Sequence, residues 1–260
     1  MIETTRPLRG LLSTFRASVA ALAMLALPAQ AVDLGSMSAE EREAFRAEVR
    51  SYLLDNPEVI LEAIEILEQR QAVAEAQADV ELVASNREAL FDDGYSWVGG
   101  NPDGDITLVE FMDYRCGYCR RAVPEVEELL AADGNIRLII KEFPILGDAS
   151  VLSSRFAVAT KHVAGDEAYK QVHDALIAFS GEPSEVSLRR LAEGLGLDAD
   201  PIMAAMDSDQ VTEELRQTRE LAQRLRISGT PTFVLENELL RGYLPADQLA
   251  IIAAEQREQG

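Results

Sequence analysis

The stretch that decides the fold is FMDYRCGYCRR at residues 111–121, which contains both cysteines of the 260-residue chain, Cys116 and Cys119. An apolar run over residues 106–112 leads into it and a helix-like pattern follows, so the cysteines lie where a strand gives way to a helix. Free N–H groups and the helix dipole at such a junction stabilise a thiolate at Cys116. Cys119 follows one turn later, within reach of a disulfide, and the sequence therefore predicts redox chemistry.

Two other uses of a closely spaced cysteine pair remain open. A zinc site needs two further ligands, and the chain offers only His162 and His173, in a different segment. An inert structural disulfide is the second alternative, although so small a loop constrains the unfolded chain little. We read both histidines as surface or packing residues and predict no metal site.

The charge balance restricts the partners. Asp and Glu number 45 against 24 Lys and Arg, which gives a formal net charge of −21 at neutral pH. No basic cluster could neutralise a run of phosphates, so nucleic acid is excluded as a partner. An acidic surface of this kind keeps a protein soluble through self-repulsion.

Residues 1–31 have the pattern of a secretory signal peptide. Three arginines precede an apolar run at residues 17–27, and the segment ends in an A-x-A cleavage pattern at Ala31. The apolar run is short for a bilayer span, and a retained anchor is the alternative. We therefore expect cleavage after Ala31 and a mature protein in an oxidising compartment, where a lone cysteine pair suits an active site.

The segment 32–92 is predicted to be helical. A capping-box pattern at residues 38–41 opens one helix that runs to about residue 54, and Asn56 with Pro57 starts a second. Apolar and small residues follow a 4-3-4-3-4 spacing along the second helix at Ile60, Ile64, Leu67, Gln71, Ala74 and Ala78. This seam either packs on the catalytic domain or pairs with copies of itself; we favour an oligomerisation arm within residues 38–87.

The remainder reads as a thioredoxin-like α/β domain with helices inserted in its middle. A turn-rich stretch at 97–104 is followed by the strand at 106–112 and the cysteine helix. The later elements are a strand at 135–141, helical patterns over 149–226, strands at 231–236 and 238–243, and a helix from about 245.

The stretch SGTPTF at residues 228–233 supplies the second half of the predicted site. A proline at the start of a strand, after Gly229 and Thr230, is a plausible place for a cis peptide bond. A cis bond would turn the Thr230 backbone toward the thiols, where an extended substrate chain could hydrogen-bond to it. An ordinary trans Pro231 in an edge strand is the alternative, and the cysteine pair favours the cis form.

Two charged residues interrupt apolar strands, Glu110 and Lys141. An unpaired buried charge is costly, so we expect the two side chains to pair and to carry protons for Cys119 during exchange. The alternative is that either side chain reaches solvent at the end of its strand.

Three runs together resemble the DsbA family of thiol-disulfide oxidoreductases: EFMDYRCGYC at 110–119, KEFPILG at 141–147 and GTPTF at 229–233. The resemblance implies a catalytic domain over residues 93–258 with a helical insertion at about 148–226.

Carried over residue by residue, the DsbA resemblance implies Cys116 as the nucleophile and Cys119 as the buried resolving thiol. It also implies Pro231 as a cis proline preceded by Thr230, and Glu110 as the buried acid. No metal or organic cofactor is implied.

The motif CGYC and the segment 45–71, which includes YLLDNPEVI, resemble the ScsC-like branch of the family. This branch implies a trimer joined through its N-terminal helices, and a disulfide isomerase or reductase. Gly117 and Tyr118 stand where strongly oxidising members have Pro-His, which leaves the direction of exchange open.

The expected partners are secreted proteins with thiols or disulfides and a membrane redox protein, and the expected compartment is the periplasm. A monomeric disulfide donor and a Cu(I)-binding protein are the alternatives.

Overall fold

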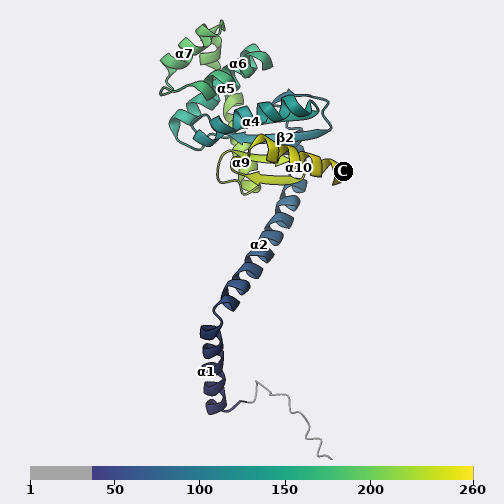
Figure 1. The fold of residues 1–260 in the computed structure, drawn as a ribbon. Coiled ribbons are helices and arrows are strands. Elements are labelled where there is room, and N and C mark those ends of the chain that lie inside the picture. Colours follow the sequence, from purple (N-terminus) through teal and green to yellow (C-terminus); the bar gives the residue numbers. More distant parts are fainter. Residues whose placement is uncertain (1–36, 260) are drawn as a thin grey trace, which may run out of the picture. The chain divides into compact units, whose positions relative to one another are not determined.

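The structure is a computed structural model that describes residues 37–259 (Figure 1). The predicted signal peptide, residues 1–31, and its cleavage site lie outside the described residues. Within residues 37–259, no helix is both long enough and apolar enough to cross a membrane.

The N-terminal helices begin and end at capping residues. Helix α1, Ala39–Asp55, opens with the predicted capping box, in which the Ser38 hydroxyl accepts from Glu41 N–H and the Glu41 carboxylate accepts from Ser38 N–H. Asn56 ends α1, and α2 spans Glu58–Ser85. Large apolar side chains are exposed along both helices: Phe45, Val49, Tyr52, Leu54, Ile60, Leu61, Ile64, Ile66, Leu67, Val73 and Val80.

Internal contacts divide the chain between Ala63 and Ile64, earlier than the boundary expected at residues 92 and 93. The difference arises because the last turns of α2 and the short helix α3, Arg87–Phe91, pack on the sheet. Val83 is fully buried there. The Asp79 carboxylate accepts two hydrogen bonds from the Arg241 guanidinium at 2.5 and 2.9 Å.

One mixed sheet forms the centre of the catalytic unit, with the strand order β1-β3-β2-β4-β5. Strand β2, Ile106–Met112, pairs in parallel with β3, Ile136–Glu142, and antiparallel with β4, Thr232–Leu235. The β5 strand, Glu238–Arg241, extends the sheet beside β4. The β2 strand agrees with the prediction, and β3 begins one residue later than expected.

The first strand, β1, Trp97–Gly100, was predicted to be a turn. It pairs antiparallel with β3, from Trp97 opposite Ile140 to Gly100 opposite Arg137. A Cβ atom on Gly99 would lie 2.0 Å from the Trp97 ring, because the indole folds over this glycine. Two consecutive glycines conceal the strand from sequence patterns, since glycine is rare in strands.

Helices cover both faces of the sheet (Figure 1). On one face lie α4, Gly117–Asp133, and α10, Ala246–Gln259. Helix α9, Asp209–Arg224, lies on the other with α3 and the end of α2. The remaining helices of the insertion are α5 (Asp148–Ala164), α6 (Asp166–Ala178), α7 (Glu185–Gly194) and α8 (Ala199–Ala205). Apart from the added strand β1, the order of strands and helices is the predicted thioredoxin-like one.

A substitution at Gly100 tests the close packing of β1 on β3. Gly100 has φ +65°, and a Cβ atom there would lie 2.4 Å from the Ile136 carbonyl oxygen. We expect Gly100→Ala to lower the free energy of unfolding by about 3 kcal/mol, measured by urea denaturation. Gly194→Ala is the control, because its Cβ meets nothing within 4 Å; it should be neutral or stabilising by up to about 1 kcal/mol. Equal effects of the two changes would contradict this account.

A candidate dithiol active site

Cys116 occupies the N-cap position of α4. Its backbone is extended, with φ −78° and ψ 117°, and its sulfur accepts a hydrogen bond from the Cys119 N–H at 3.5 Å. Cys116 Sγ also lies 3.1 Å from the Thr230 carbonyl oxygen, to which the thiol donates. Both cysteines are free thiols in this structure. The geometry is that expected at a strand-to-helix junction: the Cys119 N–H faces the Cys116 sulfur, and the N-terminus of the helix stabilises negative charge there.

Asp113 fixes the loop between β2 and α4. Its side chain is fully buried, and one carboxylate oxygen accepts from Arg115 N–H at 2.8 Å. The other accepts from the N–H groups of Ile145 and Leu146, at 2.8 and 3.1 Å. Asp113 thereby joins the cysteine loop to the loop after β3. No role was predicted for Asp113, although its position directly after a buried strand is a signal in the sequence.

The Thr230–Pro231 peptide bond is cis, as the sequence indicated. The segment around it is held at both ends: the Thr232 hydroxyl donates to Gly229 O at 2.8 Å, and Gly242 N–H donates to Pro231 O at 3.0 Å. The structure therefore brings together four of the predicted site residues, Cys116, Cys119, Thr230 and Pro231.

Glu110 lies on the α4 face of the sheet, only 2% exposed. Burial, together with the negative charge of Glu142, raises the pKa of Glu110 to about 8. Its Oε1 atom is buried and has no hydrogen-bond partner among the described residues. Burial also raises the pKa of the Cys119 thiol, and the Glu110 charge adds to that increase. Both groups therefore favour their neutral forms when the dithiol is reduced.

The predicted pair between Glu110 and Lys141 is not formed, and that expectation was wrong. In the β2–β3 register Glu110 lies opposite Ile140, whereas Lys141 lies opposite Phe111, so the two side chains point to different faces. Lys141 is fully buried; its ammonium group forms an ion pair with Asp93 and donates to Ala89 O at 2.9 Å. Burial lowers the pKa of Lys141, which the Asp93 charge opposes.

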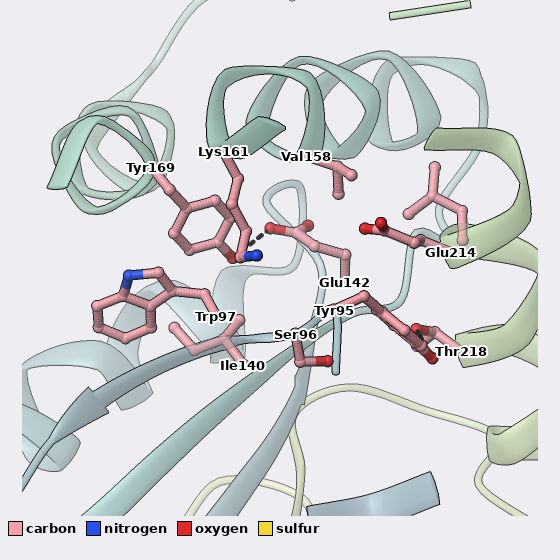
Figure 2. A pocket seen from close by; sticks show the side chains of 11 residues that line it. Tyr95, Ser96, Trp97, Ile140, Glu142, Val158, Lys161, Tyr169, Glu214 and Thr218 are labelled. Carbon is pink, nitrogen blue, oxygen red and sulfur yellow. Dashed lines mark hydrogen bonds between the residues drawn. The ribbon is translucent and has the colours of Figure 1, made fainter. Parts of the chain in front are cut away.

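Glu142 is a second buried carboxylate, for which no role was predicted from the sequence. The hydroxyls of Tyr114, Tyr169 and Ser154 each donate to it at 2.7 Å. Burial raises the pKa of Glu142 to about 7, and these hydrogen bonds oppose the increase. Figure 2 shows Glu142 and Tyr169 at a small cavity that Lys161 also lines. Neither cysteine lines this cavity, so it is separate from the dithiol.

Family models match two parts of the chain. The DSBA-like thioredoxin domain matches residues 107–252, which include both cysteines and Pro231. The N-terminal domain of the copper resistance protein ScsC matches residues 41–74, in α1 and α2. The two matches cover the catalytic unit and the helical arm respectively.

Solved structures agree with these matches. A thioredoxin-like oxidoreductase from Silicibacter pomeroyi is 41% identical, with a TM-score of 0.62 over 67% of this chain and 99% of that one. ScsC from Proteus mirabilis in a transitional conformation is 29% identical, with a TM-score of 0.62 over 87% of this chain and 99% of that one.

The chain spans less than a third of the length of the first curated relatives that it matches. The Na⁺/H⁺ antiporter NhaA 3 of Salinispora tropica is 31% identical over 56% of this chain, which spans only 22% of the antiporter. A probable disulfide bond formation protein D of Bacillus anthracis is 25% identical over 54% of this chain and 69% of that protein.

The pKa of Glu110 predicts how stability depends on pH. Folded protein keeps the Glu110 proton up to about pH 8, whereas the unfolded chain loses it near the ordinary value of 4.5. The unfolded state thus binds fewer protons in this range, and the free energy of unfolding falls as pH rises, by about 1.4 kcal/mol for each pH unit. We expect Glu110→Gln to remove this part of the fall and to be the more stable protein at pH 8.

The measurement is urea unfolding of the reduced protein at pH 5, 6.5 and 8. Glu255→Gln, a change at an exposed position of α10, is the matched control and should follow the original protein. If the E110Q and original curves ran parallel with pH, the assigned pKa would be wrong.

Proposed function

The chain belongs to the DSBA-like thioredoxin domain family of thiol-disulfide oxidoreductases, and from this premise we propose that it exchanges disulfides with secreted proteins in the periplasm. The observation that carries the proposal is the position of Cys116 Sγ, at the N-terminus of α4 and 3.1 Å from the Thr230 carbonyl oxygen. The signal-peptide pattern of residues 1–31 supports the compartment.

The exchange begins at Cys116. Its thiolate attacks one sulfur of a client disulfide, a Cys116–client bond forms, and the other client sulfur leaves as a thiolate. In reduction, Cys119 then attacks Cys116 Sγ, the client thiolate leaves, and two electrons have passed from the protein to the client. In isomerisation, another client thiolate attacks the client sulfur instead, and Cys116 returns as a thiolate.

The backbone before Pro231 is the proposed client-binding edge. Thr230 O faces Cys116 in the free dithiol and is released when the sulfur bonds to a client. An extended client segment can then pair with the Thr230 backbone as an added strand. Proline has no N–H, so the client meets no competing donor at position 231.

Glu110 is the proposed proton acceptor for Cys119. The Cys119 thiol is buried and its pKa is raised, so it cannot attack until its proton is removed. A carboxylate with a pKa of about 8 can take that proton near neutral pH. Glu110 is thus proposed to lose its own proton first, to take the Cys119 proton as that thiol attacks Cys116 Sγ, and to be neutral afterwards, as it is in the resting dithiol.

The proposed direction is isomerase or reductase. The match of residues 41–74 to the ScsC N-terminal domain supports it, as do the exposed apolar side chains on α1 and α2. An apolar stripe of this kind fits association with further copies of the chain, which presents several dithiols to one client. A membrane redox protein is the proposed source of electrons for the reduced form.

A disulfide donor is the second candidate, favoured by the similarity to a probable disulfide bond formation protein. The reduction potential of the Cys116 and Cys119 pair distinguishes the two. A value near about −120 mV favours the donor, and one near about −270 mV favours the isomerase or reductase. A stoichiometric, tight Cu(I) complex of the two thiols would instead support metal capture.

Serine substitutions test the two thiols. Cys116→Ser should abolish exchange, because no nucleophile remains at the end of α4. Cys119→Ser should accumulate mixed disulfides with client proteins, seen on non-reducing gels and removed by dithiothreitol. Exchange that persists in the Cys116 variant would overturn the assignment.

Removal of residues 32–69 tests the arm. The cut leaves Glu75, Asp79 and Val83, which contact the catalytic unit. We expect the mature protein to be a trimer by light scattering, and the shortened protein to be a monomer that oxidises dithiols but does not isomerise a scrambled client.

Two full-length variants accompany the deletion. The double change I64E/L67E should dissociate the assembly through loss of apolar contacts, whereas E65Q/E68Q on the same helix should not. A monomeric mass for the unaltered mature protein would contradict the proposed arm.

A further inference from the structure

Three arginines flank the dithiol, and two of them are bonded within the protein. Arg115 donates to Gly181 O at 3.0 Å and to the Glu182 carboxylate at 3.1 Å. Arg120 donates to the carbonyl oxygens of Tyr114 and Phe179, at 3.0 and 2.8 Å. Both guanidinium groups therefore serve to hold the cysteine loop against the helical insertion.

The third, Arg121, is exposed and has a different environment. Its guanidinium lies 4.2 Å from the ring centre of Tyr118 and 5.8 Å from that of Tyr243. Among residues 37–259, no carboxylate forms an ion pair with it. A guanidinium that packs by its face on aromatic rings keeps its edge N–H groups available to a carboxylate.

This aromatic cation site adjoins both halves of the dithiol centre. Tyr118 lies between the two cysteines in sequence and is 55% exposed. Tyr243 follows Gly242, whose N–H donates to the Pro231 carbonyl oxygen at 3.0 Å. A client held against Thr230 and bonded to Cys116 would therefore lie beside Arg121.

Glu125 fixes Tyr243 without neutralising Arg121. One oxygen of the Glu125 carboxylate accepts from the Tyr243 hydroxyl at 2.7 Å, and the other accepts from Ala246 N–H at 2.9 Å. Both oxygens are used, and the ring that supports the guanidinium is held in place. The cation is thus positioned before any client binds.

We propose that Arg121, supported by Tyr118 and Tyr243, selects clients that carry an acidic side chain next to the reacting cysteine. The inference rests on the proposed disulfide exchange and adds a client preference to it. A chain with a net charge of −21 repels acidic polypeptides in general. The Arg121 guanidinium beside the thiols counteracts this repulsion locally and so determines which acidic polypeptides bind there.

The test measures the rate at which the reduced mature protein displaces thionitrobenzoate from cysteine peptides. Protein thiolate attacks the peptide sulfur, a protein–peptide disulfide forms, and coloured thionitrobenzoate leaves. One peptide has Asp on both sides of the cysteine and the other has Lys. The readout is the ratio of the two rates, which cancels any change in the intrinsic reactivity of Cys116.

Two charge reversals are compared, Arg121→Glu and Arg216→Glu. Both change the net charge equally, and Arg216 lies on α9, which packs on the opposite face of the sheet. We expect the acidic-to-basic rate ratio to be about tenfold lower in R121E than in R216E, and R121K to retain most of the original ratio. The difference should shrink in high salt.

Equal ratios in R121E and R216E would overturn the inference, and so would a loss of rate in R121E that is the same for both peptides. If the unaltered protein displaced thionitrobenzoate from neither peptide, the proposed exchange itself would fail. Should R121E not fold, the comparison of R121K with the neutral R121Q replaces it, with a lower ratio in R121Q as the supporting result.

Discussion

Hydrogen bonding on both edges of β2 is the constraint on which the rest of the structure depends. The strand is parallel to β3 on one side and antiparallel to β4 on the other, so it cannot shift along either neighbour without breaking both ladders. Because the cysteine loop follows Met112 directly, this fixed strand sets the position of α4. Strand β4, which pairs with β2, begins one residue after Pro231. The cysteine loop and the Thr230–Pro231 segment are therefore both held in place by β2.

Buried charge is divided between the two faces of the sheet. On the α4 face, Glu110 and Glu142 are carboxylates whose pKa values are raised, and no buried lysine of residues 37–259 accompanies them there. On the other face, Lys141 is compensated by Asp93 and plays no part near the thiols. A buried carboxyl without a cationic partner keeps its proton near neutral pH, and that property suits it to exchange protons with a thiol. An ion pair at that position would have lowered the carboxyl pKa instead.

Features with local causes could be predicted from the sequence. The cysteines at a strand-to-helix junction and the capping box of α1 each depend on residues close in sequence, whereas the cis bond before Pro231 was favoured only in combination with the distant cysteine pair. Whether Glu110 and Lys141 lie on the same face of the sheet depends on the register between β2 and β3. A shift of one residue in that register would place the two side chains on the same face. Strand β1 is hidden by two glycines, of which Gly99 is required by the Trp97 ring and Gly100 by the close approach of β3. The hydrogen bonds of Asp113 join loops more than thirty residues apart, which no local pattern reveals.

The attachment of α2 has a consequence for how this protein can vary between relatives. Within the described chain, the contacts of α2 with the sheet come from its C-terminal part, through Glu75, Asp79 and Val83. A residue inserted before Glu75 would turn the preceding helix by about 100° and move it by about 1.5 Å, while the contacts of the dithiol stayed the same. The length of α2 can therefore change by insertion or deletion of residues without a change in the chemistry of Cys116.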